Sequence, residues 1–244
     1  MSFKKIVCLV AIQLISVSIA QDNLHVNEEL GHGINKRAAV SNDSFLWPGG
    51  VVKYFLDQSS QMKLWAIHNK IIQEIMDEFH NKTCIKFKPT NDIADFVLFR
   101  NHYSLGNNSV ENSFGYSGSR QSFALSSIKI HKWEILRGFM KMLGFYPEEW
   151  RVDRNESFQI KDRRLGTVVE PVDKDWWAQY WGGYNDLDVP YDFCSVMQWP
   201  LNYQEHWFIK TPLKTYNCSE PVGYATHLSD LDVLKINKLY NCTA

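Results

Sequence analysis

His131 and Glu134 have a spacing that could serve metal chemistry, because they lie three residues apart at the start of a predicted helix and could share one face. Zinc sites need three or four ligands, so an isolated pair favours a surface contact over a metal site. The other histidines of the predicted mature domain show no ligand spacing: His68, His80, His102, His206 and His227.

No motif indicates covalent catalysis. The serine motif G-x-S-x-G is absent, since GYSGS at 115–119 ends in serine rather than glycine. Cys8 falls within a predicted signal peptide, and the four remaining cysteines are an even set expected to form disulfides in an oxidising compartment. The sequence alone permits three pairings of these cysteines, and it leaves no thiol to act as a nucleophile.

Residues 134–154, EILRGFMKMLGFYPEEWRVDR, combine a helical segment with a sharp turn. Metzincin zinc proteases carry H-E-x-x-H-x-x-G-x-x-H at such a place. Two histidines share a helix face, the glycine lets the chain turn, and the third histidine reaches the same ion. The glutamate after the first histidine takes the proton of zinc-bound water.

The second half of this stretch, GFYPEEWRVDR, resembles G-F-x-H-E-x-x-R-x-D-R of the astacin family of metzincin zinc metalloproteases. Four further segments resemble blocks of that family in their usual order: WPGGVVKY (47–54), TCIKF (83–87), SVMQW (195–199) and LSDLDVLKINKLYNC (228–242). The resemblance implies an α+β, two-lobed single domain. Its N-terminal part would be a twisted sheet with two long helices, and its C-terminal half would be mostly irregular and end in a helix.

The same resemblance places unsuitable residues where zinc would be held. Counted from Gly144, which is expected to end the helix in a left-handed conformation, the three ligand positions fall on Arg137, Lys141 and Pro147. The general-base position falls on Gly138. Arginine stays protonated, lysine usually does, and proline has no side-chain donor atom. We therefore expect no intact catalytic or metal site and no cofactor, with zinc only if the chain is an active enzyme.

The two cations admit two interpretations. Arg137 and Lys141 would supply positive charge where zinc would stand, so an anionic group such as a carboxylate could bind there. Alternatively, both pair with Glu148, Glu149 or another acid, and this interpretation is favoured because buried charges need partners.

The remaining family positions are structural or concern processing. Met197 keeps the Met-turn position and is interpreted as a core methionine, whereas Trp199 replaces the family's zinc-neighbouring tyrosine and offers only an N–H donor. The basic end of segment 21–37 predicts cleavage after Arg37. By resemblance, the new Ala38 amine would then dock near Glu148.

The resemblance also implies a disulfide between Cys84 and Cys242. That pairing leaves Cys194 and Cys218 to form the second disulfide, which should contribute on the order of 3 kcal/mol.

Hydrophobic periodicity predicts the elements that must position these residues. Strands are predicted at 51–57, 84–90, 96–101 and 122–130, and helices at 60–80, 133–143 and 228–240. A Gly/Asn/Ser-rich loop is predicted at 104–119. No internal repeat or linker divides the chain, so one α+β domain is expected.

The first 20 residues predict a cleaved signal peptide, because a basic start precedes an apolar run too short for a membrane span. A short pro-segment at 21–37 and an astacin-like peptidase domain at 38–244 follow. The net charge of −1 argues against a nucleic-acid or anionic-membrane surface. Because of the predicted signal peptide we expect a secreted, extracellular protein, and we expect it to be a monomer. The glycosylation candidates are Asn42, Asn81, Asn107 and Asn155.

Three functions are compatible with these observations. The first is a secreted homologue without proteolytic activity that binds a peptide or protein in its cleft, or acts as a decoy. The second is a zinc metalloendopeptidase, the activity that the family resemblance implies. The third is a structural glycoprotein without cleft function. Metal content and proteolysis separate the second from the others.

Overall fold

A computed structural model of the chain describes residues 39–57, 63–92, 94–102, 110–126, 130–162, 164–170, 185, 187–201 and 208–243. These residues belong to one compact unit, Asn35–Ala244. The predicted signal peptide, the pro-segment, the Arg37–Ala38 junction and the sequon at Asn107 lie outside the described residues.

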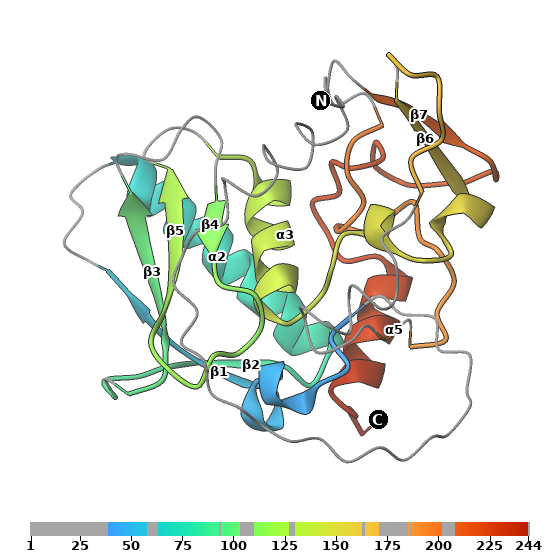
Figure 1. The fold of residues 1–244 in the computed structure, drawn as a ribbon. Coiled ribbons are helices and arrows are strands. Elements are labelled where there is room, and N and C mark those ends of the chain that lie inside the picture. Colours follow the sequence, from blue (N-terminus) through green and yellow to red (C-terminus); the bar gives the residue numbers. More distant parts are fainter. Residues whose placement is uncertain are drawn as a thin grey trace, which may run out of the picture. The chain divides into compact units, whose positions relative to one another are not determined.

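A five-stranded sheet of order β2-β1-β3-β5-β4 organises the first half of the described chain (Figure 1). Neighbouring strands are parallel except at the edge, where β4 runs antiparallel to β5. In β1 the buried residues Val52 and Tyr54 alternate with less buried ones, as expected for a strand that covers a core with one face. The strands are β1 Val51–Leu56, β2 Lys86–Pro89, β3 Val97–His102, β4 Val110–Asn112 and β5 Gln121–Ser126.

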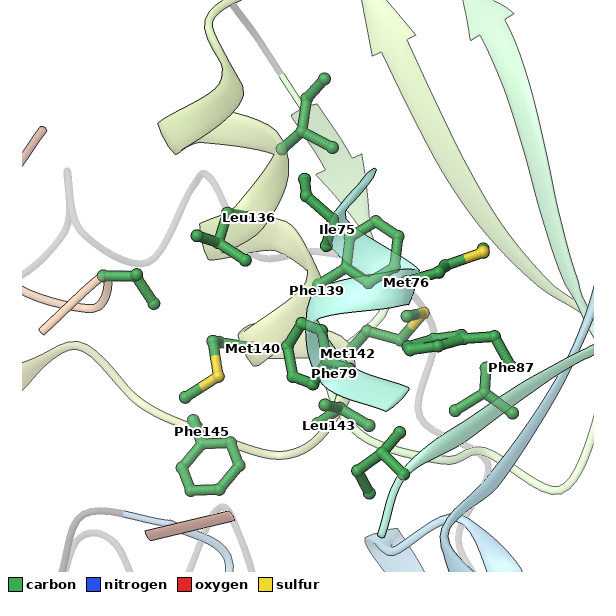
Figure 2. Packing of buried hydrophobic residues seen from close by; sticks show 14 of the residues in the cluster. Ile75, Met76, Phe79, Phe87, Leu136, Phe139, Met140, Met142, Leu143 and Phe145 are labelled. Atoms are coloured by element: carbon green, nitrogen blue, oxygen red, sulfur yellow. The ribbon is translucent and has the colours of Figure 1, made fainter. Parts of the chain in front are cut away.

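Two helices share a core with this sheet: α2 Lys63–Lys82 and α3 Lys132–Met142 (Figure 2). On α2 the fully buried residues recur at three- and four-residue steps, which makes one apolar stripe. Phe139 of α3 joins the layers, since its ring centroid lies 6.1 Å from that of Phe79 on α2 and 5.5 Å from that of Phe99 on β3. The core therefore fixes the rotation of α3, and with it the direction of Arg137 and Gly138.

The C-terminal half contains short elements around a final helix. Strands β6 Phe158–Asp162 and β7 Phe208–Pro212 pair antiparallel. Helix α5 Asp230–Leu239 begins at Ser229, whose hydroxyl accepts the N–H of Asp232 at 2.9 Å. Short 3₁₀ turns complete the described elements: η2 Asp43–Phe45, η3 Pro48–Gly50, η4 Glu148–Trp150 and η5 Arg154–Glu156.

The predicted α+β class and the existence of the three helices are confirmed, but one prediction about the sheets is wrong. Strand β4 lies inside the segment predicted to be a loop, because three residues of an edge strand carry too little periodicity to be visible. The described residues of the C-terminal half are mostly irregular and end in a helix, as predicted. The pair β6–β7 within this half was not predicted, because its strands are joined by a long intervening segment that gives no hairpin signal.

Both predicted disulfides are present. Cys84–Cys242 ties the end of α5 to the start of β2 across 158 residues, and Cys194–Cys218 closes a loop of 24 residues. In the part of the chain that the structure describes, no helix is long and apolar enough to cross a membrane.

Candidate functional site

Helix α3 ends in a tight turn at Gly144, whose φ of 93° lies in the left-handed region that favours glycine. The N–H of Phe145 closes the turn on the Met140 carbonyl at 3.1 Å. The Gly144 carbonyl in turn accepts the N–H of Val40 at 3.1 Å, so an extended segment at residues 39–40 packs on the turn. Ala39 in that segment is fully buried.

Arg137, at the first ligand position, crosses from α3 to two loops. Its guanidinium donates to the carbonyls of Val196 at 3.0 Å and Gln198 at 2.7 Å, within the Met-turn loop (residues 195–200). It also donates to the Gly223 carbonyl at 3.1 Å, within the Gly223 loop (residues 219–226). Two indole rings flank the same group, with centroids 5.0 Å away for Trp133 and 5.9 Å away for Trp199.

Gly138, at the general-base position, has no space for a side chain. A Cβ built on it would lie 2.7 Å from Cζ of Phe123 and 3.0 Å from Cγ1 of Val110. Its carbonyl accepts the amide of Asn112 at 2.8 Å, which fastens strand β4 to the helix. A carboxylate at this position would have to displace a core ring.

Lys141 and Pro147, at the other ligand positions, also have other roles. The Lys141 ammonium donates to the Asn112 carbonyl at 2.9 Å. Partial desolvation lowers the pKa of Lys141, while the nearby charge of Glu111 opposes that shift. Pro147 is half-buried and precedes the 3₁₀ turn η4, which its fixed φ suits.

The residues at these positions do not fit a zinc ion. A guanidinium, an ammonium and a prolyl ring offer none of the imidazole, thiolate or carboxylate atoms that zinc binds in proteins. Among the described residues, no group of three or more His, Cys, Asp or Glu side chains could hold a metal. His131 and Glu134 form a helix-start contact, in which the Glu134 carboxylate accepts the His131 N–H at 2.8 Å.

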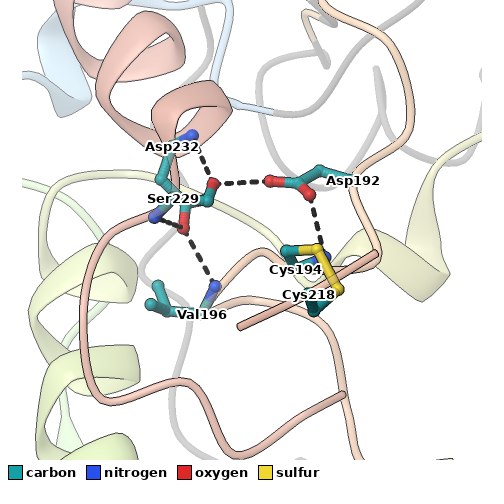
Figure 3. The surroundings of a disulfide bond; sticks show 6 residues. All are labelled: Asp192, Cys194, Val196, Cys218, Ser229 and Asp232. Carbon is teal, nitrogen blue, oxygen red and sulfur yellow. Dashed lines mark hydrogen bonds between the residues drawn. A yellow bond between two sulfur atoms is a disulfide. The ribbon is translucent and has the colours of Figure 1, made fainter. Parts of the chain in front are cut away.

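The Met-turn loop is anchored to α5 by a buried carboxylate. Asp232 accepts the Ser195 hydroxyl at 2.6 Å and the N–H of Val196 at 2.9 Å, and Figure 3 shows its link through Ser229 toward Asp192. Burial raises the pKa of Asp232 to about 6 against the opposing charge of Lys235, and Asp192 adds to the rise.

Met197 and Trp199 occupy this same loop. Met197 is buried in the main core, and its carbonyl accepts the N–H of Glu148 at 3.2 Å. Trp199 is half-buried, and its ring also lies 5.7 Å from the Lys210 ammonium. The tyrosine position therefore holds a ring within cation–π distance of Arg137 and Lys210.

The chain that follows the turn at Gly144 leads into a group of buried charges, here called the Glu148 cluster, which is made of Glu148, Arg151, Asp192 and Lys235. Glu148 is 2% exposed, forms a close ion pair with Lys235, and lies 3.7 Å from the Arg151 guanidinium. Its second oxygen accepts the N–H of Asp192 at 3.4 Å. Arg151 also forms a bidentate pair with Asp153 at 2.8 Å.

This arrangement corrects one part of the favoured prediction for the two cations of α3, namely that they pair with Glu148 or Glu149. Glu148 binds Lys235, and Glu149 binds Lys210 at 3.1 Å, whereas Arg137 and Lys141 bind main-chain carbonyls. The prediction missed Lys235 although its position carried a signal. It falls on the apolar stripe of α5 with Ile236 and Leu239, where a lysine needs a buried partner.

The glycosylation candidates within the described residues differ in their surroundings. Asn81 is exposed in the last turn of α2. Asn42 is exposed and accepts the N–H of Ser44 at 2.9 Å. The Asn155 side chain is engaged on both sides, since it donates to Glu170 at 2.7 Å and accepts from Arg154 at 3.1 Å.

Fold and turn together define a metzincin-type α+β domain, and Arg137, Lys141 and Pro147 stand where the sequence resemblance places the zinc ligands. Residues 39–241 match the Astacin peptidase family, and the chain belongs to this family. The chain is 30% identical to "Zinc metalloproteinase nas-4" of Caenorhabditis elegans over 88% of its own length and 64% of that protein. It is also 30% identical to "Astacin-like metalloendopeptidase" of Gallus gallus, covering 85% of the chain and 49% of that protein.

A solved structure supports the fold. The hatching enzyme zinc-protease high choriolytic enzyme 1 of Oryzias latipes aligns with a TM-score of 0.62 at 21% identity, covering 85% of this chain and all of that one. The chain spans only 48% to 64% of the first curated relatives it matches. Family membership and fold are therefore shared, and the activity of this chain is a separate question.

Proposed function

We propose that this chain is a secreted astacin homologue without proteolytic activity, which binds a peptide or protein segment or acts as a decoy for partners of active relatives. The observation that carries the proposal is the closed position at Gly138. Phe123 and Val110 occupy the space that a general-base side chain needs, since their nearest atoms lie 2.7 and 3.0 Å from where its Cβ would stand. The substituted ligand positions then remove the metal as well as the base.

A binding role is supported by an open pocket that includes part of the Gly223 loop. Its volume is about 540 Å³, and its walls include Leu201, Val222 and the side chains of Tyr216 and Tyr224. Both tyrosines are large and exposed, at 44% and 40%. Exposed aromatic rings around a concavity are typical of surfaces that receive apolar side chains of a ligand.

Secretion is supported by the predicted signal peptide and by the two disulfides, which persist in oxidising compartments. N-terminal sequencing of protein collected from the culture medium tests processing. A start at Ala38 supports removal of the pro-segment, and a start at Gln21 refutes it.

Metal content and proteolysis of the purified secreted chain test the lack of activity. We expect far less than one zinc per chain by mass spectrometry, and no casein hydrolysis that a chelator abolishes. An active astacin-family protease, prepared in the same way, is the positive control for both readouts. Stoichiometric zinc together with chelator-sensitive cleavage would establish the alternative, a zinc metalloendopeptidase.

Peptide-display selection against the same protein tests binding. We expect enriched peptides whose capture falls at least about tenfold when Tyr224 is changed to alanine, because truncation of a central aromatic residue costs this much or more at many interfaces. Leu165→Ala is the matched control, since Leu165 is exposed and does not line the pocket. Enrichment that is insensitive to Tyr224→Ala would contradict binding at this pocket.

A further inference from the structure

Arg137 connects three segments that are distant in the sequence. Its acceptors are Val196 and Gln198 of the Met-turn loop and Gly223 of the Gly223 loop, while the residue itself belongs to α3. The acceptors are main-chain carbonyls, so their positions are set by the paths of the two loops. A single planar group with donors in a fixed fork can satisfy several such acceptors at once.

The two loops are in close contact at the point where Arg137 holds them. A Cβ at Gly223 would lie 2.1 Å from N and 2.3 Å from Cα of Pro200, so these two stretches of backbone touch. Gly223 also has a φ of 85°, which favours glycine for a second reason. The disulfide Cys194–Cys218 joins the residues that directly precede the same two loops.

Two aromatic rings lie within cation–π distance of the Arg137 guanidinium and help to hold it in place. Trp133 lies one turn earlier on α3, and Trp199 lies in the Met-turn loop itself. Trp133 in turn packs edge-on against Tyr224 of the Gly223 loop, with centroids 5.4 Å apart. Rings from the helix and from one loop thus contact a cation whose hydrogen bonds reach both loops.

We infer that Arg137 is a structural cross-link that fixes the Met-turn loop and the Gly223 loop to α3 without a metal. The hydrogen bonds of the guanidinium connect these segments in the way that a metal ion connects the segments that carry its ligands. The inference concerns the rigidity of these loops and holds whether or not the neighbouring pocket binds a peptide.

The test compares Arg137→Met with Lys141→Met in the full mature chain. Both substitutions remove a cation from a former ligand position on the same helix, but Lys141 donates to a single carbonyl on strand β4. Hydrogen exchange of main-chain amides in the two loops is measured, with amides of β3 and β5 as an internal reference. The rate at which a thiol reduces Cys194–Cys218, relative to Cys84–Cys242, is a second readout.

Arg137→Met is expected to raise exchange in both loops by about tenfold or more, since hydrogen bonds to charged groups restrain local opening. It should also speed reduction of Cys194–Cys218, and β3, β5 and Cys84–Cys242 should stay unchanged. Lys141→Met should change none of these. Equal effects of the two variants, or an increase spread evenly over the chain, would overturn the inference.

Arg137→Lys keeps the test decisive if the methionine variant does not fold. A lysine retains the charge but loses the fork of N–H donors. The hydrogen-exchange rate of main-chain amides in the two loops should therefore lie between the wild-type rate and the rate expected when all hydrogen bonds of Arg137 are lost. Exchange identical to the wild type would show that charge alone suffices, which contradicts the cross-link.

Discussion

The two cations of helix α3 and the charges of the Glu148 cluster are held in different ways. Arg137 and Lys141 donate to neutral carbonyls, and neither is fully buried. Glu148 and Lys235 are each 2% exposed at the side chain and pair with each other. Loss of a cation on α3 leaves neutral acceptors, whereas loss of one in the cluster leaves a buried charge alone.

The comparison teaches where substitution is tolerated in this domain. Arg137 and Lys141 on α3 donate to backbone carbonyls, which are present whatever the sequence of the partner segment and accept any suitable donor. Positions in the Glu148 cluster are constrained in pairs. The structure thus separates residues that could lose a chemical role from residues that the fold itself requires.

The largest effect is expected for Lys235→Met. This change leaves Glu148 buried without its close partner, and breaking a buried pair typically costs about 3–5 kcal/mol. Chemical denaturation measures the loss. Lys238→Met is the matched control on the same helix, because Lys238 donates to the Leu187 carbonyl at 2.7 Å from an exposed position.

A double variant sharpens this prediction. Glu148→Gln combined with Lys235→Met removes both charges and should recover much of the stability that Lys235→Met loses. No recovery in the double variant would mean that Lys235 acts through packing, and the contrast between the two regions would fail.

Gly138→Ala should destabilise the protein by about 1–3 kcal/mol, the usual cost of overpacking a core. The direction of the change in unfolding free energy shows whether the position is closed, since alanine in place of glycine within a helix ordinarily stabilises by about 1 kcal/mol. Thermal unfolding with the calorimetric enthalpy gives the change in free energy.

Phe123→Leu provides the control for Gly138→Ala. The smaller side chain opens space beside Gly138, so the alanine should cost less in the Phe123→Leu background than in the wild type. A stabilising Gly138→Ala in the wild type would show that the general-base position is open, which would weaken the proposed lack of activity.

Much of this contrast could be predicted from the sequence, and the remainder could not for identifiable reasons. The turn at Gly144 and the three helices followed from periodicity and local pattern, and the substituted positions followed from the family resemblance. The acceptors of Arg137 did not, because carbonyls carry no sequence identity. The closure of Gly138 by Phe123 depends on how β5 packs on α3, and the partner of Glu148 lies 87 residues away on α5.

The pH dependence of stability should distinguish Asp232 from exposed acids. Its pKa is raised to about 6 in the folded protein from an ordinary value of 3.8, so the folded state holds the proton more tightly. The contribution of Asp232 to the free energy of unfolding is fully present below about pH 4. It is lost as the pH rises through 6, with a slope of at most about 1.4 kcal/mol per pH unit.

The measurement is the difference in unfolding free energy between the wild type and Asp232→Asn from about pH 4 to about pH 7, a range that brackets both pKa values. This difference should shrink as the pH rises. Asp230→Asn, at an exposed position in the same helical turn, should give a flat difference. A difference that grows with pH would mean that Asp232 stabilises the fold as a carboxylate, which would contradict the raised pKa.

The smallest effect is expected for Trp199→Tyr, which restores the residue type found at this position in the family. The Trp199 ring lies 5.9 Å from the Arg137 guanidinium and 5.7 Å from the Lys210 ammonium, and a smaller ring weakens both contacts. The loss should be about 0.5–1 kcal/mol, in the range of cation–π contacts at partly exposed sites. No chelator-sensitive casein cleavage should appear, because a tyrosine hydroxyl alone supplies neither metal nor base. A loss as large as that of Lys235→Met would place Trp199 with the paired charges of the Glu148 cluster, and the division between the two regions would have to be redrawn.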